Sequence, residues 1–268
     1  MPDTPESEPH VDFRSFVEIV RRLRKECPWD RDQTHESMRT PFIEEVYEAV
    51  DAIDSQDWPV LAEELGDILL NVVFQAVLAE EAGRFTIADV LERETSKLVF
   101  RHPHVFGDVT ADNADQVLRN WEQLKQQESD RESVLDGVPR SLPSLMFAER
   151  VQSKAARVGF DFPTQHDAWA KVTEEIEELG AIDPEQKERW SEELGDLLFA
   201  VVNIGRLNGV SPEMELRAAN DKFAQRFRYI EARLRAQGRS PNDASLEEMD
   251  RYWEEAKNAE RKTLNEKR

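Results

Sequence analysis

Apolar residues recur at helical spacing along much of the chain. In residues 42–53 they fall at i, i+1, i+4, i+5, i+8 and i+11, which defines one broad apolar face of a helix; they are Phe42, Ile43, Val46, Tyr47, Val50 and Ile53. Two further segments follow a similar rule, namely Leu65, Ile68, Leu69, Val72, Val73 and Ala76, and later Leu194, Leu197, Leu198, Val201, Val202 and Ile204. The pattern predicts an all-α chain.

The helical pattern belongs to a tandem repeat. The strings EELGDILL (63–70) and EELGDLLF (192–199) are nearly identical, and PWD (28–30) recurs as GFD (159–161). Eight polar or aromatic positions recur in the same order: Glu45, Glu48, Glu64, Asp67, Lys97, Arg101, Trp121 and Lys125 return as Glu175, Glu178, Glu193, Asp196, Lys222, Arg226, Trp253 and Lys257. Ordered matches of this kind are the signature of a duplicated unit.

The division between the copies is marked by a polar segment containing Pro139 and Pro143, which is typical of a linker. We therefore expect one repeat over residues 10–130, a linker over 131–143 and a second repeat over 144–268. Each copy has room for four or five helices joined by short loops. Such a small unit leaves apolar surface exposed, so we expect each copy to pack against another, within the chain or in a homodimer.

The composition favours helices, and the net charge argues against two classes of partner. Hydrophobic residues make up 39% and charged residues 34% of the 268 residues, and glycine is sparse at 10. The net charge of −21 repels nucleic-acid backbones and anionic membranes, so we expect neither as a partner. Cys27 is the only cysteine, and no signal-peptide pattern or membrane-length apolar run is present. We expect a soluble, cytoplasmic protein.

The repeated acids predict a metal site. Glu175 and Glu178 lie three apart on one helix face, and Glu193 and Asp196 do so on the next helix. If the two helices pack antiparallel, four carboxylates converge, and like charges at such distances oppose folding. A hard divalent cation, Mg²⁺ or Mn²⁺, relieves this repulsion. One such pair is common on a solvated helix face, but two pairs repeated at the same spacing favour metal.

Gly66 and Gly195 stand inside these strongly helical segments, where glycine costs about 1 kcal/mol relative to alanine. Their recurrence suggests close approach of another backbone or room for a ligand.

The repeated cations fit a phosphate ligand. Lys222 and Arg226 lie one helical turn apart, as do Trp253 and Lys257. Arg offers a bidentate fork and Lys a point charge for phosphate oxygens, although ordinary salt bridges to nearby Glu remain open. Trp253 could stack on a base or pack in the core. Carboxylates that hold a metal beside such cations describe a polyphosphate site.

At this point the chain resembles a known family, the MazG nucleoside triphosphate pyrophosphohydrolases. The resemblance rests on EExxE followed by ExxD, on KLVFRHPHVF (97–106) and on WEQLK (121–125), and it covers most of the chain. It implies two tandem all-α domains with four-helix-bundle-like packing, related to the dimeric all-α nucleotide pyrophosphatases. It also implies Mg²⁺-dependent cleavage of nucleoside triphosphates to monophosphate and pyrophosphate, with loose base preference, in nucleotide-pool sanitation or stress-linked nucleotide control.

Carried onto this sequence, the resemblance implies site residues mainly in the second copy. The metal ligands would be Glu175, Glu178, Glu193 and Asp196. The nucleotide contacts would be Lys171, Glu174, Glu192, Lys222, Arg226, Trp253 and Lys257. A possible second site in the first copy would comprise Glu45, Glu48, Glu64, Asp67, Lys97, Arg101, Trp121 and Lys125.

The two copies differ at one informative place. Lys171 precedes Glu175 by four residues, whereas the matching position before Glu45 is Pro41, which brings no cation and is expected to begin the helix instead. We therefore expect the second copy to carry the main catalytic site.

Two other classes of protein remain as alternatives. A ferritin-like di-iron protein also uses carboxylates from a four-helix bundle, but it needs Glu-x-x-His pairs that these segments lack. The other alternative is a non-enzymatic helical interaction module whose acids bind a basic partner.

Overall fold

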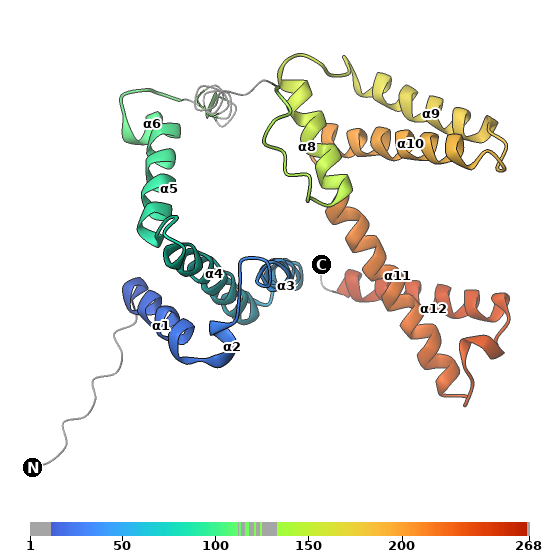
Figure 1. Ribbon diagram of the computed structural model, residues 1–268. Helices are drawn as coiled ribbons and strands as arrows, with labels where there is room; N and C mark the ends of the chain where they lie inside the picture. Colours follow the sequence, from blue (N-terminus) through green and yellow to red (C-terminus); the bar gives the residue numbers. More distant parts are fainter. Residues whose placement is uncertain are drawn as a thin grey trace, which may run out of the picture. The chain divides into compact units, whose positions relative to one another are not determined.

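The computed structural model describes residues 12–111, 113, 116–117, 121, 124 and 133–266, with side chains as far as residue 262. Within these ranges every regular element is a helix (Figure 1). The chain divides into two compact units, residues 1–130 and 131–268, and each is described by itself. Among the described helices none is long and apolar enough to cross a membrane.

The first unit is built on a helical hairpin. Its α3 and α4 pack along each other, and α1 packs against α4. A hydrophobic core joins α1 to the second half of α4 and contains Val17, Val20, Val73, Phe74 and Val77. The described helices are α1 (Phe13–Glu26), α2 (Pro28–Arg31), α3 (Arg39–Ser55), α4 (Trp58–Glu81), α5 (Ile87–Arg101) and α6 (Pro103–Phe106).

The second unit contains two hairpins. One is α9 with α10, covered at one end by α8; the other is α11 with α12, which has its own small core around Ile230, Leu234 and Tyr252 (Figure 1). Its elements are α8 (Ser144–Arg157), α9 (Gln165–Ala181), α10 (Lys187–Leu207), α11 (Pro212–Arg235), the 3₁₀ turn η1 (Pro241–Asp243) and α12 (Leu246–Glu266).

Local sequence signals explain where the acid-bearing helices begin and end. Thr164 starts α9 through a capping box with Asp167, which satisfies backbone N–H groups of the first turn. Asp57 caps α4 by accepting from the backbone N–H of Val60 at 3.3 Å. The expectation that Pro41 begins its helix is wrong, because α3 begins at Arg39.

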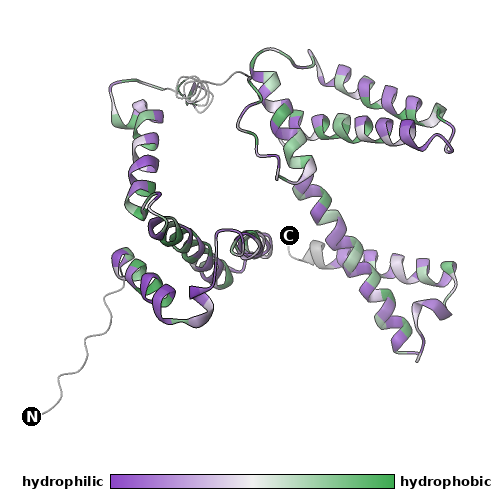
Figure 2. Ribbon diagram, in the orientation of Figure 1, coloured by the Kyte–Doolittle hydropathy of each residue, from purple (hydrophilic) through white to green (hydrophobic). Residues whose placement is uncertain are grey.

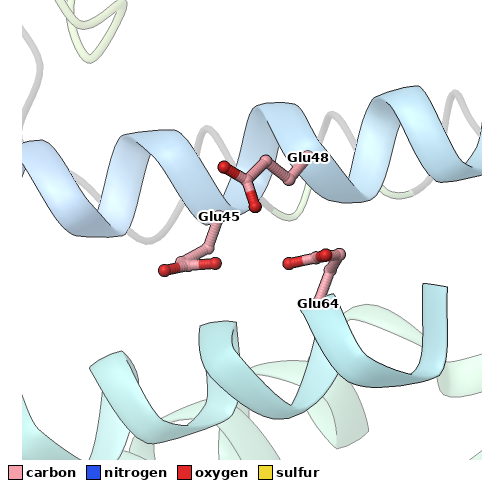
Figure 3. A group of neighbouring side chains, drawn as sticks. All are labelled: Glu45, Glu48 and Glu64. Carbon is pink, nitrogen blue, oxygen red and sulfur yellow. The ribbon is translucent and has the colours of Figure 1, made fainter. Parts of the chain in front are cut away.

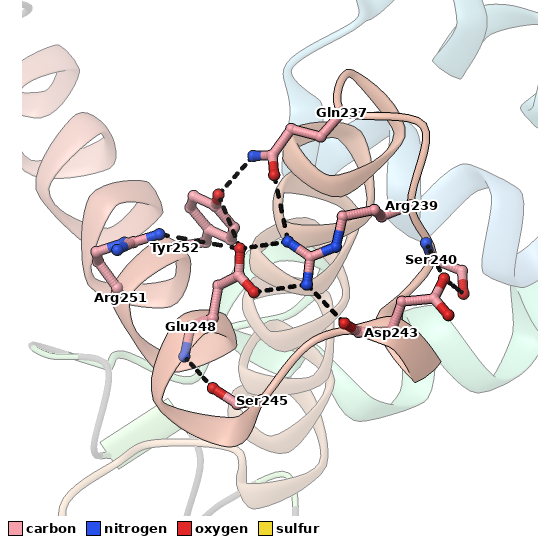
Figure 4. A network of polar contacts seen from close by, with 8 residues as sticks. All are labelled: Gln237, Arg239, Ser240, Asp243, Ser245, Glu248, Arg251 and Tyr252. Carbon is pink, nitrogen blue, oxygen red and sulfur yellow. Dashed lines mark hydrogen bonds and ion pairs between the residues drawn. The ribbon is translucent and has the colours of Figure 1, made fainter.

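The turn between α11 and α12 is fixed by a polar network (Figure 4). The guanidinium of Arg239 donates to both carboxylate oxygens of Glu248 at 2.8 Å and to the backbone oxygen of Asp243 at 2.5 Å. Ser240 and Asp243 form a capping box around η1. A bidentate pair of this kind sets geometry as well as energy, so α12 is held at a defined angle to α11.

The helical periodicity is confirmed, with polar and apolar residues interleaved along the helices (Figure 2). Many of these apolar side chains stay exposed within each unit. Ile43 is 57% exposed in α3 and Leu65 is 54% exposed in α4. In the second unit Trp169, Ile176 and Leu198 are each at least half exposed. The hairpins therefore present apolar faces that their own unit does not bury.

Candidate metal and nucleotide site

The acids of the first copy converge as the spacing predicts (Figure 3). Glu45 and Glu48 project from α3, and Glu64 projects from α4. Carboxylate oxygens of these three residues lie within 4.8 Å of one another. Asp67, one turn further along α4, is not in this group, although its charge acts on Glu45.

The acids of the second copy make a similar cluster with a different membership. Glu175 comes from α9, while Glu193 and Asp196 come from α10, and oxygens of the three again lie within 4.8 Å of one another. Glu178 is outside the group and acts on Glu193 through its charge. Three of the four expected ligands are thus brought together in each copy.

In both clusters, burial and repulsion between neighbouring acids raise carboxyl pKa values. Burial raises the pKa of the Glu45 carboxyl, and the charges of Asp67, Glu48 and Glu64 add to this. Burial likewise raises the pKa of Glu64 and of Glu193, again helped by neighbouring acids. Buried like charges are stabilised by a cation. The donor set is all carboxylate, which fits a hard divalent ion such as Mg²⁺ or Mn²⁺.

Lys171 gives the second cluster a cation of its own. Its ammonium lies 2.6 Å from an oxygen of Glu175, whose side chain is only 5% exposed, and 2.8 Å from an oxygen of Glu174. Hydrogen bonds to Glu174 and then to Glu175 raise the pKa of Lys171. Glu192 is exposed on α10 and its charge contributes to the raised pKa of Glu193.

The expected cation set forms a separate group on α11 and α12. The Arg226 guanidinium stands 5.3 Å from the centre of the Trp253 ring. It also donates three hydrogen bonds to the carboxylate of Glu260, at 2.7 to 3.2 Å. Lys222 is exposed on α11, and Lys257 pairs with Glu254 at 3.0 Å. Trp253 packs with Phe223 as well.

Beside the acids of the second copy lies a pocket of about 700 Å³. Lys171, Glu175 and Asp196 stand in its wall, together with residues of α8, α10 and the segment 159–162. None of Lys222, Arg226, Trp253 and Lys257 belongs to the described residues that line it. The structure brings the acids and Lys171 together, but it does not bring the α11–α12 cations to them within one chain.

The first copy repeats part of the cation group. Arg101 lies 5.3 Å from the centre of the Trp121 ring, as Arg226 does from Trp253. Lys97 forms an ion pair with Glu94. Lys125 lies outside the described residues.

Sequence reasoning missed the polar groups of the pocket. Gln152 on α8 and Asn203 on α10 are buried, and Arg206 and Asp161 pair at 2.5 Å in the same wall. A comparison of the two copies in register could have found them, because matching helices carry different residues at these positions.

Comparison with known proteins decides the family. The model of the MazG nucleotide pyrophosphohydrolase domain matches twice, at residues 33–106 and 164–230. The chain belongs to the MazG family. A nucleoside triphosphate pyrophosphohydrolase of Escherichia coli K12 is 42% identical over 91% of this chain and 97% of its own length. One from Thermotoga maritima is also 42% identical, over 91% of this chain and 95% of its own. The uncharacterized YabN of Bacillus subtilis is 45% identical over 94% of this chain and 53% of its own length.

Membership of the MazG family confirms the resemblance, the all-α class with two copies, and the enzyme class at the level of the family. It favours hydrolysis of nucleoside triphosphates over the di-iron and interaction-module alternatives. The matched segments contain all eight acids that recur between the copies but leave out α8 and α12. The ligand roles of individual residues, the metal and the oligomeric state are taken up below as proposals.

Proposed function

We propose that this MazG chain hydrolyses nucleoside triphosphates to nucleoside monophosphate and pyrophosphate at the acid cluster of its second copy. The observation that carries the proposal is the convergence of Glu175, Glu193 and Asp196, with Lys171 beside them, at the edge of a pocket large enough for a nucleotide. Similar enzymes of the same length carry the activity in their names.

In this proposal Glu175, Glu193 and Asp196 hold Mg²⁺, with Mn²⁺ as a substitute, and Glu178 completes the set. The bound metal would supply an activated water and would neutralise phosphate oxygens. Burial raises the pKa of Glu193, and a bound cation would favour its ionised form. Lys171 exchanges its bond to Glu175 for a phosphate oxygen, which needs only rotation of a partly exposed side chain.

Glu174 and Glu192 lie on the exposed side of the cluster, on α9 and α10. We assign them to nucleotide binding. Two more carboxylates would repel a bare triphosphate, so this role would require a cation beside them. The loose base preference and the role in nucleotide-pool sanitation or stress control remain part of the proposal.

The first copy is proposed to be structural or weakly active. It keeps its acid cluster, but the position that matches Lys171 is Pro41, so Glu45 lacks the cation that Glu175 has. The domain limits of 10–130 and 144–268 are kept as proposals. Residues 133–143 belong to the second compact unit, in which Lys154 donates to the backbone oxygens of Val134 and Asp136.

A homodimer is the proposed working form. Lys222, Arg226, Trp253 and Lys257 lie apart from the acids of their own chain, and the α9–α10 hairpin exposes an apolar face. A second copy packed on that face would cover it and could bring its own α11–α12 cations to the acids.

Product analysis with matched variants tests the proposed reaction. Purified protein is incubated with each NTP and dNTP, with Mg²⁺ or with chelator, and pyrophosphate is separated from orthophosphate. We expect monophosphate and pyrophosphate only with metal, a loss of at least about 100-fold in Glu175→Gln, and near-normal turnover in the matched variant Glu45→Gln. Orthophosphate and diphosphate as products, or inactivation by Glu45→Gln alone, would contradict the assignment.

A further inference from the structure

The pocket beside the second acid cluster has the character of a site for an organic group. Its volume of about 700 Å³ lies within the range of small-molecule sites. Its wall is largely apolar and includes Phe160, Phe162 and Phe199, and Glu175 and Asp196 also line it. A nucleotide whose phosphates reach those acids would place its nucleoside in this pocket.

One wall of the pocket contains a buried hydrogen-bond acceptor without a partner. Gln152 of α8 is 9% exposed, and its side-chain nitrogen donates to the backbone oxygen of Phe199 at 2.8 Å. This bond fixes the orientation of the amide. The Oε1 atom is buried and has no hydrogen-bond partner among the described residues. An unsatisfied buried acceptor costs about 1–3 kcal/mol, which a donor on a ligand would recover.

A second buried amide lies on α10, one helical turn after Phe199, whose backbone oxygen holds Gln152. Asn203 of α10 is 7% exposed, and its oxygen accepts from Nε of Arg206 at 2.7 Å. Arg206 is itself held by Asp161 at 2.5 Å. The amide nitrogen of Asn203 is therefore the group turned away from Arg206, and the hydrogen bonds of the described residues give it no acceptor. The pocket wall thus carries one free acceptor and one free donor.

The first copy has filled the same place with core side chains. Aligned helix for helix, α1 with α8 and α4 with α10, Arg21 stands where Gln152 stands and Phe74 where Asn203 stands. Arg21 bonds to Glu80 at 2.8 Å, and Phe74 is 3% exposed in the hydrophobic core with Val77, the counterpart of Arg206. The acids are kept in both copies. Asn71 Oδ1 of the first copy is also buried without a partner, but it stands at neither of the two matching positions, which Arg21 and Phe74 occupy.

We infer that the α8–α10 pocket of the second copy receives the nucleoside, with Gln152 accepting from the base edge and Asn203 donating to it. The inference rests on the proposed function and names the specificity residues of that site. Each common base has a donor next to an acceptor on its Watson–Crick edge. A single donor–acceptor pair accordingly binds many bases, which accounts for a loose base preference, and the first copy carries no such pair at the two matching positions.

Turnover of ATP is compared with turnover of two analogues, each of which lacks one of the two contacts. Purine riboside triphosphate lacks the 6-amino donor that Gln152 would accept from. 1-Deaza-ATP lacks the N1 acceptor that Asn203 would donate to. We expect the wild type to favour ATP over each analogue by about three- to tenfold in kcat/KM, the value of one hydrogen bond. Gln152→Met should abolish the preference over purine riboside triphosphate alone. Asn203→Leu should abolish the preference over 1-deaza-ATP alone.

Each preference is a ratio within one protein sample, so partial unfolding of a variant does not change it. Equal turnover of the three triphosphates by the wild type would overturn the inference, and so would preferences that both variants retain. Absence of pyrophosphate from any triphosphate would instead contradict the proposed function.

Discussion

At the scale of single residues, Lys171 balances a buried carboxylate. Without metal, Lys171→Met leaves Glu175 beside Glu193 and Asp196 with no cation. Lys171 is 38% exposed, so solvent screens the pair, and we expect a loss of about 1 kcal/mol in the free energy of unfolding. Urea denaturation in chelator measures this loss, and Mg²⁺ should reduce it by supplying the missing charge.

Lys257→Met is the matched control, because its partner Glu254 is 51% exposed and lies outside both acid clusters. Its loss should be small and the same with and without Mg²⁺. A loss in Lys171→Met that Mg²⁺ leaves unchanged would separate Lys171 from the metal site.

The raised pKa values of Glu45, Glu64 and Glu193 predict how pH affects metal binding. Between the ordinary value of 4.5 and the raised value, the folded chain binds more protons than the unfolded chain. The metal-free stability contributed by these acids therefore falls as pH rises through that window. Mg²⁺ binds the ionised form, so we expect it to raise the Tm more at pH 7.5 than at pH 5. Differential scanning calorimetry measures the rise, and an equal rise at both values would contradict metal binding by these carboxylates.

The residue scale also shows what spacing can and cannot predict. Helix periodicity and a short turn predicted that four acids converge, because they fix which helix faces meet. Glu175, Glu193 and Asp196 do lie together, whereas Glu178 lies outside the group. Gln152 was missed, because a buried amide looks like any polar helix position until the neighbouring helix is known. Spacing alone cannot decide whether Arg226 binds phosphate or forms a salt bridge with a nearby Glu. In the structure Arg226 donates to Glu260.

At the scale of helices, the start of α9 sets the position of the acid that it carries. The hydroxyl of Thr164 accepts from the backbone N–H of Asp167 at 3.3 Å, and the carboxylate of Asp167 accepts in return from Thr164. We expect Thr164→Ala to lower the free energy of unfolding of the second unit by about 1 kcal/mol. Thermal denaturation measures it, Thr164→Ser is the control that should retain most of the stability, and equal losses in both variants would show that the cap contributes little.

Glycine in the acid helices has a different role from glycine at the helix junction. A methyl group at Gly205 would meet Pro212 at 2.6 Å, so this position needs glycine for α11 to start against α10. At Gly66 and Gly195 a methyl group would meet no described atom within 4 Å, which contradicts close backbone approach within the unit. The helices themselves were predictable from periodicity. What covers their exposed apolar faces was not, because periodicity along one helix does not identify the surface that packs against it.

At the scale of the whole molecule, a substitution at Gly195 tests whether a second chain covers the α9–α10 hairpin. A methyl group there would meet no described atom within 4 Å. In a free helix Gly195→Ala should raise the free energy of unfolding by about 0.5–1 kcal/mol. On a face packed against another copy, the added methyl group should instead weaken the dimer. We expect the second result, measured as a higher dimer dissociation constant by sedimentation. If Gly195→Ala instead stabilises a monomer and leaves its activity unchanged, that result would contradict the proposed homodimer.

The separation between the acids and the α11–α12 cations leads to a direct test of a shared site. Glu175→Gln removes a proposed metal ligand. Lys222→Met removes a proposed phosphate contact that is exposed, so no buried side chain is disturbed. We expect each pure variant to be nearly inactive. If the cations act on the partner's acids, a mixed dimer holds one intact site, made of acids from one variant and cations from the other. Coexpression of the two variants should then restore about a quarter of wild-type activity by statistical pairing. Mixed dimers that form but stay inactive would place both groups in the same chain's site, and the α11–α12 hairpin would have to move toward its own acids when nucleotide binds.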